Sequence, residues 1–130
     1  PSVCQRKLQE VMAATASNTR LHLVLAINYS SRTEIMDAVK SITRDVAAGA
    51  LREEDITPEI FDARLDTAGI PDPDLLIRTS GEMRISNFLL WQLSYTEIHV
   101  TKKFWPEFEK EDFLAALEDF RSRSRRYGGV

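Results

Sequence analysis

Two arginines and a glutamate suggest a site for a phosphate-bearing ligand and its metal ion. Arg78 follows the short apolar run 75–77, and Arg84 comes soon after it. A guanidinium can make two parallel charge-assisted hydrogen bonds to a phosphate. Glu97 lies in a strand-like run, and Mg²⁺ typically takes one or two carboxylates beside phosphate oxygens. We therefore expect the two guanidiniums and this carboxylate to face one cavity that binds a diphosphate and a divalent ion.

Small polar residues around the arginines could add further hydrogen bonds to the same anion. Residues 79–81 (Thr-Ser-Gly) can bring hydroxyls and backbone N–H groups close to it. Ser86 and Asn87 are expected to cap an apolar helix over residues 88–93. The free N–H groups at the start of that helix would add positive potential.

A purely structural role remains open for each of these charged residues. Arg78 and Arg84 could simply form ion pairs with Glu82 or Asp74. Glu97 could equally form a salt bridge on the surface of a sheet. The residue types alone do not decide between these alternatives and a ligand site.

The candidate residues require a sheet with helices around it. Strands are expected at residues 21–27, 75–77 and around 97–100. The polar segment 28–32, Asn-Tyr-Ser-Ser-Arg, follows the first strand and opens a helix in which Ser31 and Glu34 have the form of a capping box. Open parallel sheets bind ligands in such loops, although an ordinary strand–helix turn would look the same.

Apolar periodicity predicts helices over residues 3–14, from about 31 to Gly49, from Thr57-Pro58 onward, and over 110–125. Strands that alternate with helices indicate an α/β fold with a mostly parallel sheet flanked by helices. Three strands are few, so we expect a partial domain that an additional portion or partner subunit completes. The side chains expected to face inward are Ile35, Val39, Ile42, Val46, Ile60, Phe61, Leu65, Phe113, Leu114, Leu117 and Phe120.

Composition limits the class of protein. The 130 residues fit a single domain over 1–130, with 43% hydrophobic and 28% charged residues. A net charge of −3 argues against a protein built mainly for nucleic acid. One cysteine, no apolar run near membrane-spanning length and no targeting segment predict a soluble intracellular protein of the cytoplasm or plastid. The chain begins at Pro1 without Met, so we expect it to be part of something longer.

The run DLLIRTSGEMRISNFLLWQLSYTEIHV, followed by FWPEF, closely resembles the signature near the carboxyl end of the cis-prenyltransferases. The segments NYSSR and RRYGG are similar to further elements of that family, with serine for glycine at Ser30 and Ser31. The resemblance covers essentially all of the chain, but only the carboxyl-terminal half of a usual member. It implies an undecaprenyl diphosphate synthase-like fold.

This resemblance implies a prenyltransferase that condenses isopentenyl diphosphate with an allylic diphosphate and uses Mg²⁺. The family's Asp-Gly-Asn-x-Arg-Trp loop, which binds the allylic diphosphate, is not in this sequence. We therefore expect no catalytic residue in these 130 residues and little activity from them alone. Glu97 is the implied metal ligand, and the implied substrate-binding residues are Arg78, Arg84, Ile85, Ser86, Asn28, Arg32, Arg126 and Gly128.

The segment Arg126-Tyr127-Gly128 is similar to a tail that reaches the diphosphate across a dimer interface in this family. The resemblance thus implies a homodimer or heterodimer, with peripheral membrane association through the lipid product. A non-catalytic partner subunit that lends such a tail is the alternative function. Nucleic-acid binding through the basic run 121–126 is disfavoured, because basic residues at a helix end also complement the helix dipole.

Overall fold

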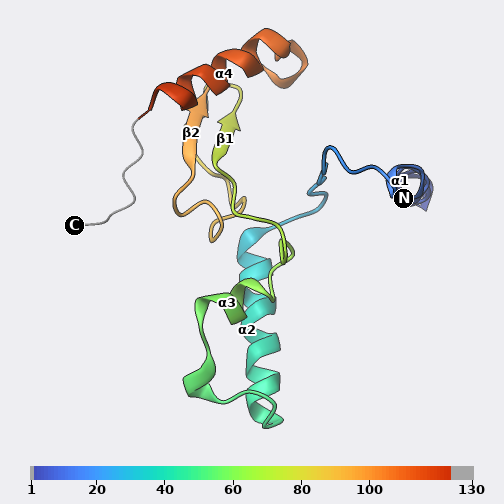
Figure 1. The fold of residues 1–130 in the computed structure, drawn as a ribbon, viewed down its shortest axis with the longest axis vertical. Helices are drawn as coiled ribbons and strands as arrows, with labels where there is room; N and C mark the ends of the chain where they lie inside the picture. Colours follow the sequence, from blue (N-terminus) through green and yellow to red (C-terminus); the bar gives the residue numbers. More distant parts are fainter. Residues whose placement is uncertain (1, 124–130) are drawn as a thin grey trace.

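The computed structural model describes residues 2–123. In this part of the chain it confirms the α/β fold with a parallel sheet, and Figure 1 shows α1 standing apart from the other elements, with none of its residues buried. None of the described helices combines the length and apolar character that a membrane span needs. The elements are α1 (Ser2–Thr15), α2 (Ser31–Ala47), η1 (Glu53–Asp55), α3 (Pro58–Asp62), β1 (Leu75–Arg78), β2 (Glu97–Val100), η2 (Trp105–Glu107) and α4 (Lys110–Ser122).

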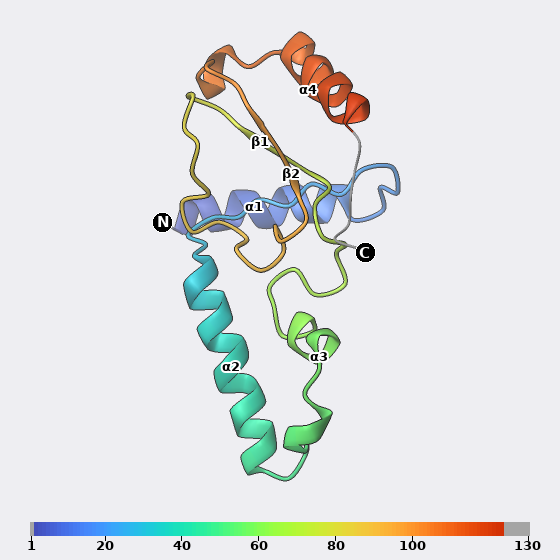
Figure 2. The same ribbon diagram turned by 90° about the vertical axis from the view of Figure 1, so that its left-hand side faces the viewer.

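Strands β1 and β2 run parallel beside each other (Figure 1) and overlap in the perpendicular view (Figure 2). Their register fixes where the candidate residues lie. Leu75 pairs with Glu97, and Arg78 pairs with Val100. Paired residues share a face of the sheet, and successive residues alternate between faces. Glu97 and Arg78 therefore start from opposite faces and opposite ends of the strand pair, separated along the strand axis by about 10 Å.

The predicted strand at residues 21–27 is wrong for the described part of the chain. This segment is not assigned to a strand and remains exposed; Leu21, for example, is 80% exposed. An apolar run becomes a strand only when a neighbour pairs with its backbone N–H and C=O groups. Within residues 2–123 the sheet contains only β1 and β2, so this run has no partner strand there.

Helix α2 buries a different face from the one expected. Its buried residues are Ser31, Glu34, Ala38 and Ile42. The prediction is confirmed for Ile42, whereas Val39 is exposed. The predicted capping box is also wrong. The N-cap residue is Ser30, which makes no side-chain capping bond, and the Ser31 and Glu34 side chains bind distant segments instead of capping the helix. The predicted stop is confirmed, with the chain leaving the helix through Gly49 at φ +71°.

For α3 and α4, the sequence predicts where each helix begins better than it predicts which side chains are buried. Thr57 caps α3, as predicted, and its Oγ1 accepts from Ile60 N at 3.4 Å. In α4 the buried residue is Ala116, and the helix ends at Ser122 rather than near residue 125. A small side chain lets α4 approach β2 closely, so its large apolar side chains project elsewhere. The inward prediction is therefore wrong for the exposed Phe113, Leu114 and Leu117.

The predicted helix over residues 88–93 does not form. Residues 86–95 are a series of turns and bends, and Ser86, Asn87 and Leu89 have φ values of +55°, +60° and +46°. Such left-handed backbone conformations do not occur within a right-handed helix. Contacts with the start of α2 fix this conformation, so the segment presents no helix N-terminus to an anion.

Candidate functional site

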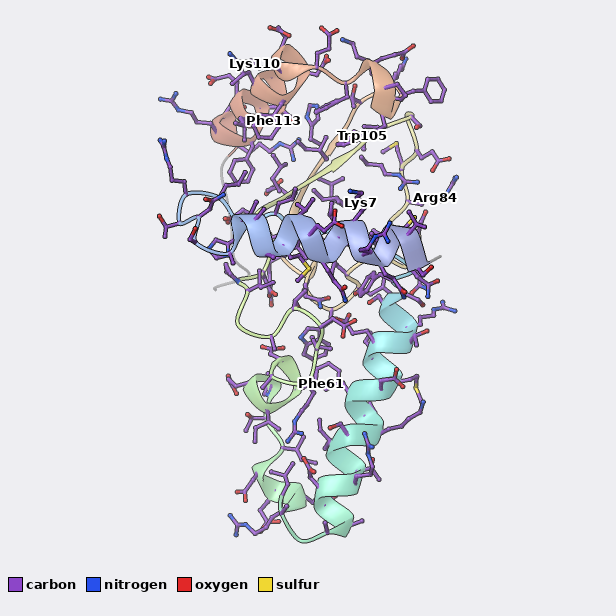
Figure 3. The ribbon with its side chains drawn as sticks, turned by 90° about the vertical axis from the view of Figure 1, so that its right-hand side faces the viewer. Lys7, Phe61, Arg84, Trp105, Lys110 and Phe113 are labelled. Carbon is purple, nitrogen blue, oxygen red and sulfur yellow. The ribbon has the colours of Figure 1, made fainter. Side chains whose placement is uncertain are left out.

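Arg78, Arg84 and Ser86 come together around Glu82, at the carboxyl end of β1. One Glu82 oxygen accepts from Nη2 of Arg78 and the other accepts from Nη2 of Arg84. The same Arg78 nitrogen lies 3.5 Å from Ser86 Oγ. The side chains of Arg78 and Glu82 are 31% and 33% exposed, while Arg84 is 66% exposed and lies on the surface in Figure 3. We call these four residues the arginine cluster; two cations and one anion leave it with a net positive charge.

A tight turn after β1 brings Glu82 back towards Arg78. Ser80 and Gly81 both have positive φ, at +68° and +67°. Their N–H groups donate to the carbonyls of Lys103 and Thr101, each at 2.8 Å. The expectation that these N–H groups bind the anion is therefore wrong, because the segment after β2 already uses them.

Asn87 ties the arginine cluster to the start of α2. Its carbonyl accepts from Ser31 N at 3.0 Å, and its Oδ1 accepts from Arg32 N at 2.9 Å. Its Nδ2 donates to Ser30 Oγ at 2.8 Å. Asn87 thus satisfies free N–H groups of α2 across a long sequence separation, instead of capping a helix of its own. The start of α2 therefore lies directly beside Asn87.

The remaining substrate-binding candidates are Asn28, Arg32, Ile85, Arg126 and Gly128. The side chains of Asn28 and Arg32 make no hydrogen bond to the arginine cluster among the described residues. Asn28 instead has a φ of +56°, at the bend that leads into the loop. Ile85 is half-buried between Arg84 and Ser86. Arg126 and Gly128 lie outside the described residues.

A buried carboxylate, Glu34, joins the first turns of α2 to the segments around Asp66 and Gln92. It is 5% exposed and accepts from Asp66 N at 2.9 Å, from Gln92 Nε2 at 3.3 Å and from the Tyr29 hydroxyl. Burial, together with the hydrogen bond to Glu34, raises the pKa of Tyr29 to about 12. Sequence reasoning missed this junction, although a signal was present: Glu34 lies one turn before Ala38 and two turns before Ile42, so it shares their helix face.

A second charged group surrounds Glu97, at the amino end of β2. Arg123 Nη1 donates to Glu97 Oε2 at 2.8 Å and to the Ile98 carbonyl at 3.1 Å. Arg123 Nη2 donates to Asp119 Oδ2 at 2.6 Å, and His99 Nδ1 lies 2.7 Å from that oxygen. We call Glu97, His99, Asp119 and Arg123 the acidic cluster, because two carboxylates and one guanidinium leave a net negative charge when His99 is neutral.

Mutual contacts perturb the groups of the acidic cluster. The hydrogen bonds from Arg123 and then from His99 hold the pKa of Asp119 below its usual value. The bonds to Asp119 and then to Glu97 raise the pKa of Arg123. Each charge is therefore stabilised by its neighbours, and the cluster fastens the end of α4 to the start of β2.

The prediction that Arg78, Arg84 and Glu97 face one cavity is wrong for the single chain. The register places the acid and Arg78 at opposite ends and faces of the strand pair, and each has a different ion-pair partner. The structural alternatives are the ones realised here: Glu82 pairs with both arginines, and Glu97 forms a salt bridge.

The described residues supply fewer than three ligands to any one metal ion. No group of three or more His, Cys, Asp or Glu side chains within residues 2–123 could hold one. Glu97 Oε2 accepts from Arg123, while Oε1 has no hydrogen-bond partner in this part of the chain. Mg²⁺ often takes one carboxylate oxygen and completes its shell with phosphate and water. Glu97 therefore fits Mg²⁺ as a single ligand whose second oxygen is fixed by an arginine.

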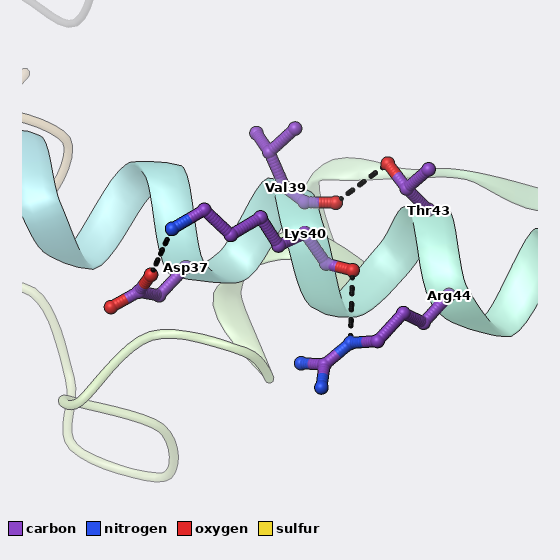
Figure 4. Close-up of a pocket in the computed structure, with 5 residues that line it drawn as sticks. All are labelled: Asp37, Val39, Lys40, Thr43 and Arg44. Atoms are coloured by element: carbon purple, nitrogen blue, oxygen red, sulfur yellow. Dashed lines mark hydrogen bonds and ion pairs between the residues drawn. The ribbon is translucent and has the colours of Figure 1, made fainter.

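Two hollows in the described surface lie away from both clusters. The larger one, of about 630 Å³, runs along an outer face of α2 (Figure 4). Its polar groups already bond within the helix: Lys40 to Asp37, Thr43 to the Val39 carbonyl and Arg44 to the Lys40 carbonyl. A second hollow lies beside α3 and the connector 69–72. Neither contains a residue of the arginine or the acidic cluster.

Known proteins resemble the chain over nearly its whole length. A prenyltransferase family model, described as undecaprenyl diphosphate synthase, matches residues 1–128. An isoprenyl transferase of Brucella abortus is 58% identical over 123 residues, which are 95% of this chain and 48% of the relative. An isoprenyl transferase of Heliobacterium mobile is 50% identical over 130 residues, covering 100% of the chain and 50% of the relative. The chain thus spans about half the length of the curated relatives it matches.

Solved structures give the same assignment. Lavandulyl diphosphate synthase from Lavandula x intermedia, in complex with dimethylallyl diphosphate, matches with a TM-score of 0.94 and 39% identity over 99% of the chain and 56% of that structure. A probable undecaprenyl diphosphate synthase from Campylobacter jejuni matches with a TM-score of 0.79 and 32% identity over 99% and 58%. The family model, the relatives and the folds agree, and the chain belongs to the cis-prenyltransferase family.

Proposed function

We propose that this chain is the isopentenyl diphosphate-binding part of an enzyme that joins isopentenyl diphosphate to an allylic diphosphate. The observation that carries the proposal is the arginine cluster, in which Arg78, Arg84 and Ser86 converge with a net positive charge. The names of the relatives, isoprenyl transferases, support the reaction class. The lavandulyl diphosphate synthase structure, which holds dimethylallyl diphosphate, supports an allylic diphosphate as the other substrate.

In the proposed reaction, Arg78 and Arg84 bind the diphosphate oxygens of isopentenyl diphosphate, and the Ser86 hydroxyl donates to one of them. This grip orients the substrate's double bond towards the allylic carbon, and such positioning can supply a large share of a rate enhancement. The bond to the allylic carbon forms as its pyrophosphate leaves, and a proton is then lost from the condensed product. Mg²⁺ would supply neutralisation of the charge that develops on the leaving pyrophosphate.

The proposed site takes residues from two copies of the chain or from a related partner. Glu97 lies at the other end of the strand pair from Arg78, on the opposite face. A single metal–diphosphate unit that contacts both residues would then take Arg78 from one chain and Glu97 from another. A homodimer or heterodimer allows this, and the family resemblance of the 126–128 tail points the same way.

Arg78→Ala in the full-length protein that contains this chain tests the proposal. We expect the KM for isopentenyl diphosphate to rise on the order of tenfold to a hundredfold, because a charge-assisted bidentate contact is lost. The KM for the allylic diphosphate should stay unchanged. Arg52→Ala is the matched control, since Arg52 pairs with Asp55 and Glu54 on η1, outside the cluster. An unchanged KM for isopentenyl diphosphate would remove Arg78 from the site.

The isolated 130 residues provide a second measurement. They cover only half of their relatives, so we expect little or no turnover from them with isopentenyl diphosphate and farnesyl or dimethylallyl diphosphate. Robust turnover by this chain alone would contradict the proposal that it carries only one of the two substrate sites.

A further inference from the structure

Glu82 lies between two guanidiniums in the way a bound phosphate would. Its two oxygens accept one hydrogen bond from Arg78 and one from Arg84. We propose that Glu82 is an internal counter-anion: it occupies the arginine cluster when no substrate is bound, and the diphosphate must displace it. This inference rests on the proposed function of the cluster, and it adds a residue that competes with the substrate.

Donor supply explains why the two anions compete. Arg78 Nη2 contacts both Glu82 and Ser86, and Arg78 Nε is buried without a hydrogen-bond partner among the described residues. A diphosphate cannot reach the buried Nε of Arg78. It must therefore use the outer nitrogens of the guanidinium, and one of these, Nη2, already donates to Glu82. A diphosphate carries more negative charge than a carboxylate and would be repelled by an acid left in place. Binding of the diphosphate therefore requires Glu82 to leave.

The chain around Glu82 suits this movement. Arg78 belongs to β1 and is held by the ladder to β2, whereas residues 82–85 have no regular secondary structure. Gly81, at φ +67°, and Ser80 precede Glu82 in a turn anchored to the segment after β2. The acid thus follows an anchored turn and begins a segment that no helix or strand ladder holds. The arginine stays where it is, and the carboxylate swings away.

Binding of inorganic pyrophosphate to the full-length protein, measured by isothermal titration calorimetry without metal, tests the inference. Glu82→Gln keeps the size of the side chain and removes its charge. We expect pyrophosphate to bind about fivefold to tenfold more tightly to Glu82→Gln, because the ligand no longer competes with one or two partly exposed ion pairs. Glu82→Asp keeps the charge but is too short to bridge both arginines, so it should lie between Glu82→Gln and the wild type.

Two further variants separate the possible outcomes. Glu54→Gln removes the same charge from η1, where Glu54 pairs with Arg52, and should bind pyrophosphate like the wild type. Arg78→Ala should bind more weakly. If Glu82→Gln binds pyrophosphate no more tightly than the wild type while Arg78→Ala weakens binding, the counter-anion inference is overturned. The arginine cluster then remains the proposed diphosphate site. If Arg78→Ala has no effect, the proposed site itself fails.

Discussion

The two ends of the strand pair carry charge groups of opposite sign. At the carboxyl end of β1, one carboxylate is shared by two guanidiniums. At the amino end of β2, one guanidinium is shared by two carboxylates. The first group has an excess positive charge and suits an anion, whereas the second, with His99 neutral, has an excess negative charge and suits a cation.

The difference shows that neighbours in a sequence motif need not be neighbours in one site. Arg78, Arg84 and Glu97 belong to one continuous stretch of sequence, and they were expected to act together. Because β1 and β2 are parallel, the chain must return from the end of one strand to the start of the next before β2 begins. The return path carries Glu97 back to the opposite end of the pair. Five experiments test how independent the two clusters are.

Mixing two impaired variants should give the largest effect when isopentenyl diphosphate and Mg²⁺ are both limiting, because each variant alone then turns over little. If each site takes Arg78 from one copy and Glu97 from another, Arg78→Ala and Glu97→Gln chains can complement each other. About half of randomly formed dimers would be mixed, each with one intact site, so turnover should recover to about a quarter of the wild type. The measurement is turnover after co-refolding of the full-length variants.

Mixing Arg78→Ala with Arg84→Ala is the control for that experiment. Both arginines belong to the same cluster, so every site in the mixed dimer contains one damaged arginine cluster and no recovery is expected. Recovery in neither mixture would show that the arginine cluster and Glu97 of a single copy serve the same site.

Loss of the Glu97 charge should change the metal requirement and leave pyrophosphate affinity without metal unchanged. Glu97→Gln removes the negative charge of the carboxylate, whose Oε1 has no partner among residues 2–123, so the Mg²⁺ concentration for half-maximal turnover should rise on the order of tenfold. Direct Mn²⁺ binding, followed by electron paramagnetic resonance, provides a readout apart from activity. Glu118→Gln on the outer face of α4 is the control. Identical metal titrations for the wild type and Glu97→Gln would exclude Glu97 as a ligand.

Arg123 and Arg121 form a matched pair near the end of α4. Arg123 donates to Glu97, Asp119 and the Ile98 carbonyl. Within the described part of the chain, Arg121 makes only a long, exposed pair with Glu118 at 3.9 Å. Arg123→Ala should therefore lower the melting temperature of the full-length protein by about 2–4 °C. Arg121→Ala should change it very little, since exposed pairs contribute little. Equal melting temperatures for both variants would mean that the acidic cluster does not hold α4 on β2.

Asn87→Ala should weaken the connection between the arginine cluster and α2. It removes the side-chain bonds to Arg32 N and Ser30 Oγ, and a lost N-cap costs about 1 kcal/mol of stability. Urea unfolding of the full-length protein measures this loss. Asn87→Asp keeps the acceptor and should recover most of it. If Asn87→Ala is as stable as the wild type, this segment does not anchor the start of α2.

The pH dependence of stability should show the smallest effect. The pKa of Asp119 is lowered in the folded protein, so its contribution is present above the unfolded value and is lost as pH falls through the folded value. The wild type should therefore lose stability towards acid more steeply than Asp119→Asn at pH values below about 4. Urea midpoints across this range measure it. Asp72→Asn, in the exposed connector before β1, should keep the wild-type slope.

The local signals in the sequence located several elements correctly. The apolar period placed α1 and α2, Thr57-Pro58 marked the start of α3, and Gly49 marked the end of α2. Strand-like runs placed β1 and β2. These features depend on residues close together in the chain, such as a capping hydroxyl or a glycine with positive φ, so their pattern can be read without knowing the rest of the fold.

Long-range contacts decided what the sequence left open. Residues 88–93 have the composition of a helix, but Ser31 binds Leu90 N and Asn87 is used to cap α2. Ser31 and Glu34 have the spacing of a capping box, but both are buried against other segments. Residues 21–27 have the pattern of a strand, and no partner strand in the described chain pairs with them. A hydrogen-bonding group has few bonds to give, and the tertiary fold determines which competing partner receives them.

The charged residues show the same division. Their types predicted a positive group suited to phosphate and a carboxylate suited to a metal ion, because these preferences belong to the side chains themselves. Their partners and the distance between the two clusters depend on the parallel register of β1 and β2 and on where α4 ends. That information lies in contacts between residues far apart in the chain, so only the folded structure could separate the two clusters.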